Sequence, residues 1–184
     1  LSTTATGIFE LLCSFKHVHW TVSVESMEEE YEYIRHLGNW NDFVKNLDVI
    51  NKLDHKISFN MLHFILNYKS IHHCVDFLKG KGFHDNSFII GPIAGNPTHL
   101  NALNLPEPMI NECVKTLQDK LDQHPQGYLK NSYENLIKYY TTTKFERDTK
   151  KFYSEVDIMD RRRNQDSRTT FPELFKELDA YTMD

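Results

Sequence analysis

Segments with strand periodicity alternate with segments of helical periodicity in the first half of the chain, and this alternation constrains the fold most. Residues 18–24 (VHWTVSV) place every second side chain on one apolar side, and residues 57–65 and 86–93 have the composition of two further strands. Helical spacing of apolar residues is found in residues 7–16, 28–53 and 70–82. This order predicts a parallel sheet with helices packed outside it and right-handed crossovers.

The pattern changes at residue 96. Residues 96–108 (NPTHLNALNLPEP) form a proline-bearing loop, and no strand pattern follows it. Amphipathic helices are predicted for residues 108–121, 128–140, 144–162 and, after Thr170, a short last segment. The expected fold class is therefore α/β, with a sheet-bearing part at 1–95 that has three or four parallel strands, and a helical C-terminal region at 96–184.

Composition limits the partners and the compartment that we expect. The 184 residues suit one domain, and 21 Lys and Arg against 26 Asp and Glu give a net charge of −5. This charge balance disfavours nucleic acid and anionic membranes as partners. No apolar run reaches the roughly 18 residues of a membrane helix, no signal peptide is recognisable, and no CxxC pair occurs. We therefore expect a reduced, cytoplasmic protein.

The chain begins at Leu1 on a polar, turn-like stretch with no strand before it, and Met27 is its first methionine. This is typical of a sequence that starts within a domain. A processed chain, a deliberately shortened one and an incomplete reading frame all fit.

Common catalytic and metal motifs are missing from the sequence. The ten histidines contain no HxxxH or HExxH pair, and no GxGxxG, GxxxxGK or GxSxG segment occurs. We therefore expect no metal site, and we expect Cys13, Cys74 and Cys113 to fill core positions as small hydrophobic residues. The run Arg161–Arg163 fits a solvated helix end better than a phosphate site.

One cluster stands out as a candidate site. Strand parity places Ser23 and Glu25 on the side opposite the valines of residues 18–24, at the carboxyl end of a predicted parallel strand, where ligands bind in such folds. Arg35 follows about one helical segment later and could grip a carboxylate. The alternative is that Arg35 pairs with Glu28, Glu32 or a helix end. No catalytic residue can be assigned.

These residues resemble the radical S-adenosylmethionine (SAM) enzymes, in particular the twitch-domain radical SAM proteins of bacteria and phages. In that family the fifth barrel strand is valine-rich and ends in S-x-D-G, and an N-E-Y-I-R-like segment, a tryptophan and V-x-x-N-I follow. The corresponding segments here are VSVES (22–26), EYIR (32–35), Trp40 and VKNL (44–47). The tail is also similar: EVDIMDRRRNQD (155–166) and TTFPEL (169–174) resemble L-D-x-x-R-x-x-D and F-P-E-L.

The resemblance covers the later part of the family's chain. STTATG (2–7) is similar to the T-N-G turn that closes the fourth barrel strand, so Thr4 and Thr6 stand where residues near the ribose are expected. The family's C-x-x-x-C-x-x-C loop, which holds a [4Fe–4S] cluster, follows the first barrel strand and is not in this sequence. The resemblance therefore implies a partial TIM-type barrel with its helical tail.

The resemblance also implies the cofactors and their ligands. The intact protein would bind SAM and the cluster, cleave SAM reductively and abstract a hydrogen with the resulting 5′-deoxyadenosyl radical. Ser23 and Arg35 match residues that hold the methionyl and ribose parts of SAM, and Asn60 matches a polar position of the sixth strand. Glu25 replaces the usual aspartate and Ser26 the usual glycine.

Two functions are therefore expected. The first is a fragment or remnant of a radical SAM enzyme, inactive alone and without a tightly bound cofactor, whose small-molecule or peptide substrate is unknown. The second is a non-enzymatic binding protein that retains the α/β scaffold. An open half-barrel exposes a strand edge, so in both cases we expect self-association.

Overall fold

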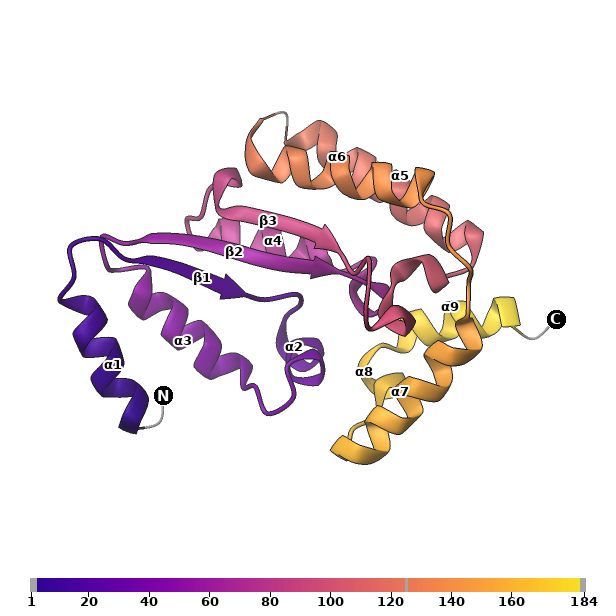
Figure 1. The fold of residues 1–184 in the computed structure, drawn as a ribbon, viewed down its shortest axis with the longest axis horizontal. Coiled ribbons are helices and arrows are strands. Elements are labelled where there is room, and N and C mark those ends of the chain that lie inside the picture. Colours follow the sequence, from indigo (N-terminus) through magenta and orange to yellow (C-terminus); the bar gives the residue numbers. More distant parts are fainter. Residues whose placement is uncertain (1–2, 125, 183–184) are drawn as a thin grey trace.

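The computed structural model describes residues 3–124 and 126–182, and its centre is a parallel sheet of three strands in the order β1-β2-β3 (Figure 1). In this register Ser23 lies opposite Asn60, and Asn60 lies opposite Ile89. The α/β class and the parallel sheet are confirmed, although each strand is shorter than the sequence pattern predicted. The strands are β1 (His19–Ser23), β2 (Lys56–His63) and β3 (Phe88–Pro92).

Helices connect and cover the strands in the first half. The α2 helix opens on three glutamates, whose charges favour the amino end of a helix, and Asn39 caps α3 by accepting a hydrogen bond from the Asp42 N–H at 2.9 Å. The short 3₁₀ helices η1 (Ile65–Asn67) and η2 (Asp85–Ser87) follow β2 and precede β3. The α-helices are α1 (Thr3–Cys13), α2 (Glu28–Ile34), α3 (Trp40–Ile50) and α4 (Ile71–Gly80).

The prediction of a turn at residues 2–7 is wrong, because the backbone is already helical from Thr3. The helix is held beside β1 by the ring of Phe9, whose centroid lies 6.1 Å from that of Trp20. Thr4 and Thr6 therefore belong to α1 rather than to a loop. Their side chains lie outside the described part of the structure.

The second half is helical, and in the described residues no strand follows β3, as predicted. Helix α7 starts five residues later than its pattern because the Asp148 side chain caps it, accepting from the Lys151 N–H at 2.9 Å. It ends at Asn164, which adopts a left-handed conformation with φ 51°. The elements are η3 (Thr98–Leu100), η4 (Ala102–Asn104), α5 (Glu107–Gln123), α6 (Gly127–Thr142), α7 (Thr149–Arg163), α8 (Ser167–Thr170) and α9 (Pro172–Thr182).

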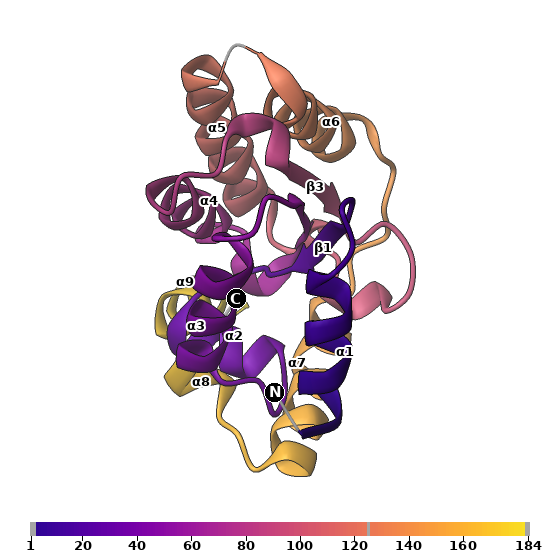
Figure 2. The ribbon, with the colours of Figure 1, turned by 90° about the vertical axis from the view of Figure 1, so that its left-hand side faces the viewer.

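The two faces of the sheet differ. One face buries Phe59, Met61 and Phe88 in a core that also includes residues of the C-terminal helices, and α4 lies behind it in Figure 1. Among the described residues no helix crosses the opposite face, where Leu62 is 41% and Ile89 52% exposed. Figure 2 shows α1 beyond the β1 edge and α6 beyond the β3 edge, not over this face. Parallel sheets are ordinarily covered on both faces, so this open face is unusual.

The two sheet edges also differ. Helix α6 covers the β3 edge, where the Ile90 N–H donates to the Ser132 hydroxyl at 2.9 Å. Among the described residues, no further strand pairs with the outer edge of β1. In the described residues the β3 edge is therefore covered, and the outer edge of β1 has no strand partner.

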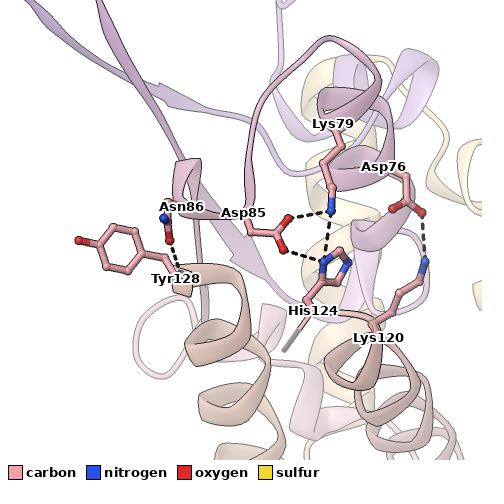
Figure 3. A network of polar contacts seen from close by, with 7 residues as sticks. All are labelled: Asp76, Lys79, Asp85, Asn86, Lys120, His124 and Tyr128. Carbon is pink, nitrogen blue, oxygen red and sulfur yellow. Dashed lines mark hydrogen bonds and ion pairs between the residues drawn. The ribbon is translucent and has the colours of Figure 1, made fainter. Parts of the chain in front are cut away.

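A polar network at the amino end of β3 joins α4, η2 and the end of α5 (Figure 3). The Asp85 carboxylate lies 2.7 Å from Lys79 Nζ and 2.9 Å from His124 Nδ1. Burial opposes the charged form of Asp85, but Lys79 and His124 together lower the pKa of this carboxyl group. Lys120 and Asp76 form a neighbouring ion pair at 3.1 Å. The network fixes helices at the end of the sheet opposite the candidate site.

Candidate functional site

The candidate site lies where the three strands end. After β1 the chain enters the core, and Val24, Glu25 and Ser26 are all almost fully buried. Arg35, at the C-terminus of α2, donates from Nε to Glu25 Oε2 at 2.8 Å and from Nη2 to Glu25 Oε1. Both residues were predicted site residues, and the structure brings them together as a pair.

The alternative partners of Arg35 are not used. Glu32 instead accepts a hydrogen bond from the Trp40 N–H at 2.9 Å, which links α2 to the start of α3. Glu28 lies exposed at the first position of α2. The Arg35 guanidinium is therefore neutralised by the residue that was expected to share a ligand with it.

Ser23 and Asn60 lie side by side on the open face of the sheet. They are register partners on β1 and β2, and both are exposed. Within the described part of the chain, neither side chain makes a hydrogen bond. At the other end of the same face, His19 Nε2 contacts Ser58 Oγ at 2.9 Å. Ser23 and Asn60 thus form an unpartnered polar pair near the carboxyl end of the strands.

A small cavity of about 240 Å³ opens at the same edge of the sheet. It is lined by residues at or just after the ends of all three strands, since Glu25 follows β1, Leu62 belongs to β2 and Ile93 follows β3. Its other walls are mainly apolar side chains from α2, the loop after β2, η3 and α7. Arg35 and Arg163 also line it. The cavity therefore combines an apolar body with charged groups at its margin.

Asn67 is a structural residue of this site that the sequence analysis missed. It is fully buried, and its Nδ2 donates to the backbone oxygens of Glu25 at 3.0 Å and Leu62 at 2.8 Å. Its Oδ1 accepts from the Phe64 N–H at 2.8 Å. These bonds join the chain after β1 to the end of β2. Nothing in the local sequence distinguishes this asparagine from a surface one.

The C-terminal tail returns to the site through α7. The Tyr33 hydroxyl donates to Asp160 Oδ1 at 2.7 Å, and Ser167 donates to Asp160 Oδ2 from its N–H at 3.0 Å and its hydroxyl at 2.8 Å. Burial, together with this bond, raises the pKa of Tyr33 well above its usual range. These contacts fix the end of α7 against α2.

The three arginines after Asp160 are not equivalent. Arg161 and Arg162 are exposed, which agrees with the predicted solvated helix end. Arg163 is half-buried and donates from Nη1 to the Tyr33 backbone oxygen at 3.3 Å. Arg163 differs from its two neighbours because α7 packs against α2 on this side.

A second hollow of about 550 Å³ lies beyond α2 and is lined by acidic side chains, including Glu28, Glu29 and Glu30. Glu30 is held by the hydroxyls of Ser26 and Ser70, the latter at 2.9 Å. This hollow carries negative charge, in contrast to the cavity beside Arg163.

The cysteines do not converge. They lie on three different helices, as predicted, but Cys13 is exposed at the end of α1, so its expected core position is wrong. Burial raises the pKa of the Cys113 thiol to about 12 and that of the Cys74 thiol further. The residues that the structure describes contain no group of three His, Cys, Asp or Glu side chains able to hold a metal. A [4Fe–4S] cluster therefore does not fit these residues.

Comparison of the chain with protein-family models, curated proteins and solved structures finds no match. Among the described helices, none is long and apolar enough to cross a membrane.

Proposed function

We propose that this chain is the later part of a radical SAM-type barrel and that its open sheet face contributes to a SAM site. The observation that carries the proposal is the pair Ser23 and Asn60, side by side and unpartnered on an uncovered parallel sheet. Ligands of α/β folds bind at the carboxyl ends of parallel strands. A hydroxyl and an amide there suit the ribose hydroxyls and the amino acid part of SAM.

The ion pair of Glu25 and Arg35 limits what Arg35 can contribute to this site. Glu25 and Arg35 form a closed pair, so the charge of Arg35 is neutralised and its fork is not available to SAM. In the intact protein the cluster would supply the electron for reductive cleavage of SAM. No residue of this chain is assigned to hold it, so SAM binding by the chain alone should be weak.

Calorimetric titration with SAM tests the proposal. The parent should bind weakly, and Ser23→Ala and Asn60→Ala should each weaken binding about fivefold, the effect of one lost hydrogen bond. Asn131→Ala, an exposed change on α6, is the matched control and should bind as the parent does. Tight binding by the parent, or affinity indifferent to Ser23 and Asn60, would contradict the proposal.

The second candidate is a binding protein that uses the same face for another chain. The exposed apolar side chains of Leu62 and Ile89 on that face favour it. Leu62→Asp and Ile89→Asp should then abolish association, and SAM should not bind. Lys45→Asp on the exposed side of α3 is the control.

A further inference from the structure

The cavity at the carboxyl edge of the sheet carries a positive charge that none of the described carboxylates neutralises. Arg163 lines this cavity, and its only hydrogen bond in the described structure is the one to the Tyr33 backbone oxygen. A guanidinium has five N–H donors. In residues 3–124 and 126–182, no carboxylate lies within ion-pair distance of Arg163. Donors therefore remain for a ligand.

Two acidic groups of this region are already engaged. Glu25, which also lines the cavity, is bound at both oxygens by Arg35. Asp160, one helical turn before Arg163, accepts from Tyr33 and Ser167. The charged residues among those that line the cavity are Glu25, Arg35 and Arg163, so its lining residues carry a net positive charge.

The rest of the cavity is apolar. Leu62, Phe64, Ile93 and Met159 supply its walls. Its volume of about 240 Å³ lies below the roughly 300–1,000 Å³ usual for drug-sized ligands, so its ligand is small. From these features we infer that the cavity binds a small carboxylic acid with a short apolar body, whose carboxylate is held by Arg163. An arginine fork matches a carboxylate geometrically.

The position of the cavity gives this ligand a role. Leu62 follows Asn60 by two positions on the open face of β2, so the cavity begins where the proposed SAM surface ends. A carboxylic acid bound here lies next to SAM and is the substrate class of the site. That assignment as substrate rests on the proposed function, whereas the binding of the acid does not.

NMR titration with 3-phenylpropionate tests the binding, with 3-phenylpropanamide as the uncharged probe of equal size. The acid should bind saturably and the amide at least about tenfold more weakly, because only the acid can form a charge-assisted bond. Arg163→Gln should weaken acid binding about tenfold and leave amide binding unchanged. Arg163→Lys should recover part of the affinity.

Controls separate this inference from folding and from the SAM proposal. Arg161→Gln, an exposed change two residues away, should bind the acid as the parent does. Leu62→Trp fills the cavity from the solvent side and should block the acid without altering Arg163. Arg163→Gln should leave SAM affinity as in the parent, whereas Asn60→Ala should leave acid affinity unchanged.

The contrary results are equally clear. Equal binding of the acid and the amide, acid binding unaffected by Arg163→Gln, or no saturable binding of the acid would overturn the inference. Failure of SAM to bind while the acid still binds would remove the proposed function and leave the acid site in place.

Discussion

Arg35 holds the buried carboxylate of Glu25 at both oxygens, with the Nε to Oε2 distance at 2.8 Å. The two side chains differ in environment, since Glu25 is 3% and Arg35 39% exposed. The pair joins the chain after β1 to the end of α2 and thereby fixes one margin of the cavity. Removing the arginine would leave a buried negative charge without a partner.

We expect Arg35→Ala to lower the free energy of unfolding by about 2 kcal/mol, since Glu25 loses its charged donor while water reaches only the arginine side of the pair. Arg35→Lys keeps the charge but loses the fork, and should cost about 1 kcal/mol. Urea denaturation measures both values. Arg162→Ala, on the exposed side of α7, should change stability by less than about 0.5 kcal/mol. A cost for Arg35→Ala as small as this control would mean that the pair contributes no stability.

Asn67→Ala should be more damaging, with a loss of about 2–4 kcal/mol. It removes three hydrogen bonds and leaves the Glu25 and Leu62 carbonyls and the Phe64 N–H without their partner. Thermal unfolding of this variant beside Asn131→Ala, an exposed change on α6, gives the comparison. A melting temperature within the error of the control would show that other groups hold the strand ends.

The sequence predicted the elements because their signals are local. Alternation in residues 18–24 and the apolar stripe of residues 70–82 depend only on neighbours in the chain, and both became the expected element. Parity also placed Ser23 on the side of its strand opposite the apolar residues, where the structure has it. The start of α1 was missed because residues 2–7 are compatible with a turn as well as with a helix.

The contacts of the site could not be predicted in the same way. Tyr33 and Asp160 are 127 positions apart, and the half-buried state of Arg163 depends on that contact. The three arginines are adjacent and alike in sequence. Their exposure differs only because α7 packs against α2 on the side of Arg163. A buried Asn67 is equally invisible, since an asparagine is ordinarily exposed.

Stability should fall as the pH is lowered from about 6.5 to about 4, and His63 is one group that causes this fall. His63 is fully buried, accepts from the Tyr140 hydroxyl at Nδ1 at 2.5 Å and donates to the Tyr68 oxygen from Nε2 at 3.3 Å. Burial lowers its pKa to about 4. Below pH 6.5 the unfolded chain therefore binds a proton that the folded chain excludes, at a cost of up to roughly 3 kcal/mol.

Urea unfolding of the parent and His63→Gln between about pH 7 and about pH 4 measures this dependence. The parent should lose stability across this range, and the variant should lose less. Burial also lowers the pKa of His72 to about 4. His72→Gln therefore measures how much of the loss in unfolding free energy comes from His72 and not from His63. Identical slopes in the parent and His63→Gln would assign the effect to other groups.

The thiols should differ in reactivity. Cys13 is exposed, whereas Cys74 and Cys113 are buried with raised pKa values, so one thiol should react with a disulfide reagent at once and two only after unfolding.

Reconstitution with iron and sulfide should leave no stoichiometric cluster, because a cluster needs thiolates that meet at one site. Cluster absorbance that is lost when any one cysteine is changed to serine would contradict this prediction.

Self-association is the last expectation, and it follows from the unpaired edge of β1. Helix α6 and Ser132 cover the β3 edge, but in the described chain β1 has no strand on its outer side. Exposed strand edges pair with further strands. The uncovered face of the sheet, which lies next to the β1 edge, adds apolar surface for association. Light scattering should therefore detect a dimer or larger species at micromolar concentration. Thr21→Pro removes an N–H from the outer edge of β1, since Val18 and its alternate residues pair with β2, and it should shift the population toward monomer, whereas Ser87→Ala before the covered strand β3 should not. A monomer across the whole concentration range would mean that α1, which lies beyond this edge in Figure 2, already protects it.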